Sequence, residues 1–260
     1  MNPPTKSRGF QWPTDDEPIE VVQGDCIKFM QKLDEGCIQA LITDPPYGMS
    51  FVSGQRVVEK KGFDGIANDS RPFIWFLYEG ARVLEEGGVL ICFCRWDGAD
   101  AFRQAIEWSG LRVIDQLIWD RVRHGMGDLK GAPSPQHDMM WLAAKGKYTL
   151  PDKRPTTVYR HQRVDGDKMQ HPTEKPVPLM EHLIEDYTRP GDLILDCFGG
   201  SGATGIAAWN TGRKCVMTEL SEQFVAVQRS RLAKLREGLC EAPKGRKQRA
   251  DRTEDPNPLV

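Results

Sequence analysis

Short apolar segments alternate with longer amphipathic ones along most of the chain, and this alternation is typical of an α/β fold. Seven short segments predict strands, at 19–22, 40–43, 88–94, 112–119, 139–143, 193–196 and 214–218. Helical periodicity predicts helices over 26–33, 72–84, 99–109, 176–187, 203–210 and 222–235. Pro72 stands at the first position of the second helix, where its missing N–H is harmless, and residues 84–88 are expected to cap the end of that helix.

Two long polar segments, 48–71 and 121–170, interrupt this alternation. Loops of this length in a compact domain usually carry a function. From Arg121 to Lys175 there are 11 Lys and Arg against 6 Asp and Glu, and from Arg229 to Arg252 there are 9 against 3. Such runs are either solvated surface or binding sites for an acidic partner.

Composition excludes several classes of protein. With 260 residues, 39% of them hydrophobic, the chain can bury a core, but no apolar run approaches the ~20 residues that span a bilayer. The first 16 residues lack a basic start followed by an apolar core, and the seven cysteines form no C-x-x-C pair. These features favour buried thiols in a reducing cytoplasm. The five histidines show no metal-ligand spacing, so no metal site is predicted.

The sharpest chemical signal is the segment LITDPPYG at 41–48, in which an apolar strand ends in Asp44. Pro45 and Pro46 fix φ twice and remove two N–H donors, which leaves their carbonyls free to accept hydrogen bonds. In open α/β sheets, ligands bind at the carboxyl ends of strands. The segment therefore predicts a site, or else a plain strand-end turn in which Asp44 is a local cap and Tyr47 packs.

A second signal is a strand that ends in Asp196 and runs into a turn with four glycines and a helix. Such a turn lets the backbone approach a ligand closely at a helix N-terminus. The next strand ends in Glu219, and an acid at that place commonly binds ribose hydroxyls. The two strand ends together predict a nucleoside site.

The third signal is the hexapeptide HPTEKP at 171–176, which precedes a predicted amphipathic helix. Thr173 is placed to cap that helix and Pro176 to open it. From the residues alone, this capping role is the preferred interpretation.

Taken together, these three segments resemble the motifs of S-adenosylmethionine-dependent DNA amino-methyltransferases. The catalytic motif precedes the glycine loop, an order similar to that of the permuted β group, which methylates adenine N6 or cytosine N4. The resemblance covers about 19–235 and implies a Rossmann-like fold with a mostly parallel seven-stranded sheet, helices on both faces and an inserted target-recognition segment. Two departures are Cys197, where the family usually has proline, and Ala203, often a threonine.

This resemblance also implies domain bounds and partners. The expected parts are an N-terminal extension over 1–18, a methyltransferase domain over 19–238 with its insert at about 121–170, and a disordered basic tail over 239–260. The expected cofactor is S-adenosyl-L-methionine, and the partner is double-stranded DNA, with no membrane. Members of the group are often dimers, which makes a homodimer one expectation.

Site roles follow from the same resemblance. In the catalytic motif of Asp44, Pro45, Pro46 and Tyr47, the carboxylate and the Pro45 carbonyl accept the two amine hydrogens, and the tyrosine stacks on an extruded base. The implied cofactor contacts are Asp25, Cys26, Thr173, Lys175, Asp196, Phe198, Gly200, Ser201, Gly202, Thr204 and Glu219. The implied DNA contacts are Arg121, Arg123, Lys130, Arg154, Arg160 and Arg163, as phosphate contacts or base readers.

The expected function is methylation of adenine N6 at a specific DNA sequence, by base flipping and in-line transfer, in restriction-modification. Asp as the first residue of the catalytic motif favours adenine over cytosine. Three alternatives stay open: methylation of cytosine N4, methylation of RNA, and a catalytically silent module that binds nucleic acid or cofactor.

Overall fold

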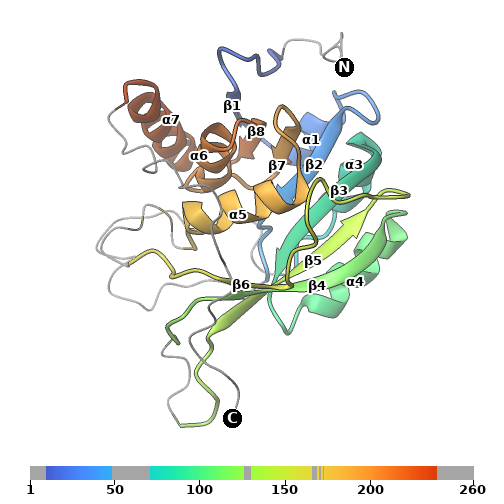
Figure 1. The fold of residues 1–260 in the computed structure, drawn as a ribbon, viewed down its shortest axis with the longest axis vertical. Coiled ribbons are helices and arrows are strands. Elements are labelled where there is room, and N and C mark those ends of the chain that lie inside the picture. Colours follow the sequence, from blue (N-terminus) through green and yellow to red (C-terminus); the bar gives the residue numbers. More distant parts are fainter. Residues whose placement is uncertain are drawn as a thin grey trace.

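The computed structural model describes residues 10–48, 71–125, 130–165, 169, 171 and 173–238 (Figure 1). The strands are β1 (Ile19–Gln23), β2 (Ile38–Thr43), β3 (Leu84–Cys94), β4 (Arg112–Asp120), β5 (His137–Ala144), β6 (Val158–Arg160), β7 (Leu193–Asp196) and β8 (Lys214–Glu219). The helices are α1 (Cys26–Met30), α3 (Phe76–Val83), α4 (Ala99–Trp108), α5 (Val177–Tyr187), α6 (Ala203–Asn210) and α7 (Glu222–Arg236).

These strands form one sheet in the order β1-β8-β7-β2-β3-β5-β4-β6. Neighbours from β1 to β3 are parallel, β5 is antiparallel to β3 and β4, and β6 is parallel to β4. The predicted α/β fold with a mostly parallel sheet is confirmed, but the described sheet has eight strands instead of seven. The extra strand, β6, has only three residues and is too short to show a period in the sequence.

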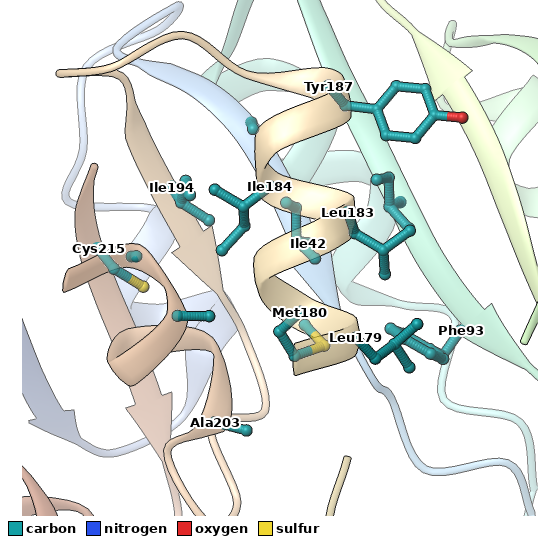
Figure 2. Close-up of a cluster of buried hydrophobic side chains, with 14 of the residues drawn as sticks. Ile42, Phe93, Leu179, Met180, Leu183, Ile184, Tyr187, Ile194, Ala203 and Cys215 are labelled. Carbon is teal, nitrogen blue, oxygen red and sulfur yellow. The ribbon is translucent and has the colours of Figure 1, made fainter. Parts of the chain in front are cut away.

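Helices cover both faces of the sheet, as predicted. Ala40 and Ile42 of β2 pack with α5 and α6, whereas Leu41 between them packs with α1, α3 and α4. Figure 2 shows α5 laying Leu183 and Ile184 over the strands that carry Ile42 and Ile194. A strand buried on both faces consists of consecutive apolar residues. This is why such strands could be located from the sequence.

The predicted start of α3 is wrong, and its predicted cap is wrong in part. Helix α3 begins at Phe76 instead of Pro72, and Pro72 instead forms an isolated bridge with Tyr47. The Phe73 N–H also donates to the Pro46 carbonyl at 3.0 Å. Helix α3 ends at Val83 with Leu84 as its C-cap, but β3 starts at this same residue, so the rest of the predicted cap at 85–88 belongs to the strand. The segment before α3, which includes Pro72 and Phe73, is therefore held against the Asp44–Tyr47 motif by backbone hydrogen bonds.

The start of α5 also differs from the prediction. Its N-cap is Pro176, which has no side chain able to accept a hydrogen bond, and no side-chain cap is formed. Thr173 lies three residues earlier, where its hydroxyl contacts the His171 ring at 3.3 Å. The predicted capping role of Thr173 is therefore wrong, and this residue is available to the site.

Several predictions lie wholly or partly outside the described residues. These include most of the polar segment at 48–71 and the whole of the tail at 239–260. The cysteines in the described ranges are free and buried, as predicted. None of the described helices is long and apolar enough to cross a membrane.

Candidate active site

A cavity of about 300 Å³ lies where parallel strands end side by side. Its lining brings together Asp25 after β1, Asp44 after β2, Asp196 at the end of β7 and Glu219 at the end of β8. Because these strands are parallel neighbours, their carboxyl ends meet at one edge of the sheet. The catalytic motif and the glycine loop, far apart in sequence, therefore open into the same space.

The cavity gathers nearly all the predicted catalytic and cofactor residues. The exception is Gly202, which lies outside the lining and holds the N-cap of α6 at a φ of 84°. Lining residues that were not predicted include Phe73, His171 and Phe224. His171 stood in a motif already singled out, whereas the two phenylalanines resembled core positions and gave no separate signal.

Asp196 holds the start of the glycine loop in place through hydrogen bonds. Its carboxylate accepts hydrogen bonds from the Thr43 hydroxyl at 2.9 Å, the Thr204 hydroxyl at 2.6 Å and the Phe198 N–H at 3.0 Å. Burial raises the pKa of Asp196 to about 6. These internal bonds occupy both carboxylate oxygens, so Asp196 and Thr204 tie β2 and α6 to the loop.

Glu219 fixes the loop from the side. The Gly200 N–H donates to its Oε2 at 2.9 Å and the Ser221 N–H donates to its Oε1 at the same distance. Burial raises the pKa of Glu219. After the neighbouring strand β1, Asp25 caps α1 by accepting the Lys28 N–H at 2.9 Å. Both predicted acids thus have backbone partners that hold them at the strand ends.

The catalytic motif carries a three-residue polar cluster. The Tyr47 hydroxyl donates to Asp44 Oδ1, and the Lys175 ammonium pairs with Asp44 Oδ2. The same ammonium lies 3.4 Å from the Tyr47 hydroxyl. Burial, followed by the nearby Asp44 charge, raises the pKa of Tyr47 well above its usual value, so the hydroxyl stays a donor. Lys175, predicted as a cofactor contact, is placed on the Asp44 carboxylate.

His171 forms part of the wall above the glycine loop. Its ring lies 4.3 Å from the Phe224 ring, measured between centroids, and its Nδ1 accepts the Thr173 N–H at 3.2 Å. Burial, followed by the Lys175 charge, lowers the pKa of His171 to about 3. The ring is therefore neutral near pH 7, with its proton on Nε2.

A consequence is that acid should destabilise the protein through His171. The unfolded ring binds a proton near pH 6.5, whereas the folded ring resists until about pH 3, so stability is lost as the pH falls through this window. We expect wild type to lose about 1–2 kcal/mol between pH 7.5 and 5 from this group. In denaturant titrations His171→Asn should lack that loss, whereas exposed His124→Asn should retain it. An equal loss in both variants would contradict the assignment.

The predicted DNA contacts lie in the range 121–170, which also contains β5 and β6. Arg121, Arg123 and Lys130 lie in the connection between β4 and β5, which leaves β4 at the same edge of the sheet as the cavity, whereas the other three lie after β5. Three of the predicted contacts are paired with acids: Arg121 with Asp138 at 3.7 Å, Arg123 with Asp165 at 3.9 Å and Arg160 with Asp120 at 3.0 Å. The other three, Lys130, Arg154 and Arg163, are exposed. The charge count of the sequence did not reveal these pairings, because the acids lie at scattered positions.

Comparison with known proteins decides the family. The family model described as DNA methylase, for N6 and N4 enzymes, matches residues 38–229. The chain belongs to this DNA methylase family. The match spans the catalytic motif, the insert and the glycine loop, and it confirms the resemblance drawn from the three motifs.

Curated relatives cover most of this DNA methylase. YubD of Escherichia coli (strain K12), which is named as a methylase, is 30% identical over 220 residues, 84% of this chain and 92% of its own length. The type II methyltransferase M2.MboI of Moraxella bovis is 22% identical over 252 residues, 84% of this chain and 89% of its own length.

Solved structures share its fold. The complex of M1.HpyAVI with S-adenosylmethionine has a TM-score of 0.65 at 23% identity and covers 82% of this chain and 98% of its own. The PvuII DNA methyltransferase, which is cytosine-N4-specific, has a TM-score of 0.65 at 18% identity. The match covers 82% of this chain and 86% of the PvuII chain. At these identities the likeness concerns the fold, and it confirms the predicted methyltransferase architecture.

Proposed function

We propose that this DNA methylase transfers a methyl group from S-adenosyl-L-methionine to adenine N6 in a specific double-stranded DNA sequence, after the base is flipped out. The observation that carries the proposal is the shared cavity, which holds the Asp44 motif and the glycine loop together. Either motif alone would fit a structural turn or a binding module. Their meeting in one space supports group transfer between two ligands.

The residues that line the cavity fit the cofactor in their chemistry. Gly200, at a φ of 48°, lets the loop turn tightly against the cavity, and Glu219 and Asp25 present carboxylates at the ends of two neighbouring strands. We assign the loop residues Phe198, Gly200 and Ser201, together with these two acids, to holding the cofactor. When bound, it supplies a methyl group already activated by a positive sulfur. The relative M1.HpyAVI was solved with this molecule.

Asp44 and Pro45 prepare the nucleophile. An exocyclic amine attacks poorly because its lone pair is delocalised into the ring of the base. Acceptance of one N–H by the Asp44 carboxylate and the other by the Pro45 carbonyl localises that pair on nitrogen. The amine nitrogen would then form its bond to the methyl carbon as the carbon–sulfur bond breaks; the sulfur would keep the bonding pair and leave as a neutral thioether, and the methylated amine would release one proton to water. Positioning of this kind contributes up to ~7–11 kcal/mol in well-oriented systems.

Tyr47 offers a surface for the flipped base. It follows the two prolines, and its bridge with Pro72 and its bond to Asp44 fix the ring at the cavity wall. Stacking of a base on an aromatic ring is worth ~1–3 kcal/mol. That energy offsets part of the few kcal/mol needed to flip a base out of the duplex.

Two amines satisfy this chemistry, adenine N6 and cytosine N4. We place adenine first because an acid at the first motif position, Asp44 in this chain, favours adenine by the family resemblance. Cytosine N4 is the second candidate, since the cytosine-N4-specific PvuII enzyme shares the fold. A silent binding module is the weaker alternative, because Asp44, Tyr47 and the glycine loop are all present in one cavity.

Product analysis tests the proposal. We expect DNA from a methylation-free host that expresses the chain to yield N6-methyladenine after digestion to nucleosides, detected by mass spectrometry. DNA from cells with an empty vector is the control. N4-methylcytosine in its place would establish the second candidate. Absence of both, with folded protein in the cell, would refute methyl transfer to DNA.

Sequence recognition is assigned to the insert at 121–170 within a catalytic domain at 19–238. Arg154 and Arg163 carry exposed charge, and Arg121 follows β4, whose carboxyl end lies at the same edge of the sheet as the cavity. Phosphate contacts position a protein on DNA, and base contacts specify the sequence. Since M2.MboI is named as a type II methyltransferase, we place this chain in the same kind of restriction-modification role. The homodimer and the cytoplasmic location stay predictions.

A further inference from the structure

We propose that Lys175 is a positioning residue for Asp44 and not a cofactor ligand. This role rests on the proposed function, because it concerns the carboxylate that accepts the amine. In the structure the Lys175 ammonium pairs with Asp44 Oδ2 and lies 3.4 Å from the Tyr47 hydroxyl. The lysine side chain is only 9% exposed and that of Asp44 19% exposed. The pair is thus largely withdrawn from water.

Aromatic rings surround the same ammonium. Its nitrogen lies 4.9 Å from the centroid of the Phe93 ring and 5.7 Å from that of the Tyr47 ring. A cation near ring faces is attracted by their negative centres, more strongly when it is desolvated. A buried ammonium needs such partners, because a charge removed from water is costly unless it is paired. The carboxylate, the hydroxyl and the two rings together hold Lys175 in one place.

The backbone at Lys175 is anchored on both sides. Before it, Glu174 pairs with Arg231 of α7 at 2.7 Å, and the same guanidinium donates to the Ser201 carbonyl at 2.9 Å. After it, Pro176 forms the N-cap of α5. Arg231 therefore joins the segment that carries the lysine to the glycine loop. The link from the Lys175 ammonium to the glycine loop therefore runs through the Lys175 backbone, Glu174 and Arg231.

This arrangement fixes the catalytic carboxylate. Tyr47 holds Oδ1 and Lys175 holds Oδ2, so the carboxylate cannot rotate without breaking a strong bond. Each carboxylate oxygen has two lone-pair sites, and one on each stays available for the amine. Because the ammonium lies against one face of the Tyr47 ring, a stacked base would use the other face.

Three variants test this role. We compare Lys175→Met, which keeps the length but removes the charge, with Lys175→Arg and with the exposed-site control Lys32→Met. For Lys175→Met we expect a dissociation constant for S-adenosylmethionine within about threefold of wild type, by calorimetry on the apo protein. At saturating cofactor and DNA, kcat should fall by about 10²-fold, since small misplacements cost that much.

Lys175→Arg should recover part of kcat, because it restores a positive charge beside Asp44, and Lys32→Met should match wild type throughout. Two results would overturn the role: cofactor binding weakened more than tenfold with kcat at saturation unchanged, which would make Lys175 a cofactor ligand, or a kcat of Lys175→Arg as low as that of Lys175→Met with both variants folded, which would make it a packing residue. Wild type that transfers no methyl group would refute the proposed function instead, and this role with it.

Discussion

Asp44→Asn is expected to lower kcat for methyl transfer to DNA by about 10³-fold, with the dissociation constant for S-adenosylmethionine within about threefold of wild type. The amide replaces an ionised acceptor by a weaker oxygen and an NH₂ group that repels the hydrogens of the target amine. Removal of one preorganised polar group at a reacting centre typically costs 10²–10³-fold. Single-turnover transfer of tritiated methyl groups to DNA measures the effect.

The substitution also leaves the Lys175 ammonium without its carboxylate partner, a loss that can destabilise the fold. The double variant Asp44→Asn, Lys175→Met removes both charges and serves as the control for stability in thermal unfolding. It should stay as inactive as the single variant. Retention of more than a tenth of the wild-type rate in Asp44→Asn would contradict the assignment of the amine acceptor.

Gly200→Val is expected to weaken binding of S-adenosylmethionine by about 10–100-fold. Gly200 has a φ of 48°, where a β-branched side chain is strained by about 1–3 kcal/mol, and its new Cβ would lie 3.5 Å from the His171 ring. Relief of this strain would move the backbone N–H that now donates to Glu219. Calorimetric titration of the apo protein measures the change.

A matched control separates the effect of backbone strain on stability from the effect of the substitution on cofactor binding. Gly212 also has a positive φ, 71°, but a Cβ there would have no neighbour within 4 Å, and the residue lies in the turn between α6 and β8. Gly212→Val should therefore lose stability without losing cofactor affinity. Equal affinity of Gly200→Val and wild type would remove the glycine loop from the cofactor site.

Most of the fold could be predicted because the hydrophobic periodicity of the sequence matches the residues that are buried in the structure. Strands such as β2 are buried on both faces, so they appear as apolar runs ended by polar residues. The start of α3 was misplaced for a local reason: Pro72 suits a helix start by its fixed φ, but the contacts of this segment with Tyr47 and Pro46 prevail. Tertiary pairing of this kind leaves no trace in local propensity.

For the site, the motifs predicted which residues meet but not how their charges pair. Asp44 and Lys175 were assigned to separate ligands, whereas the structure joins them through the ends of β2 and the segment before α5. The acids opposite Arg121, Arg123 and Arg160 were likewise missed, because pairing across strands depends on register and not on spacing. Ion pairs between distant segments require the three-dimensional fold.

The root of the insert has a consequence for how such enzymes diversify. Asp120 of β4 and His137 of β5 are register partners, and the Arg121 N–H donates to the Gln136 carbonyl at 2.9 Å just beyond them. An antiparallel pair closed in this way holds its two ends together whatever chain runs between them. Under the recognition role proposed for the insert, new target sequences can evolve by exchange of the chain between these two ends, while the proposed methyl-transfer site on the parallel half of the sheet is inherited unchanged.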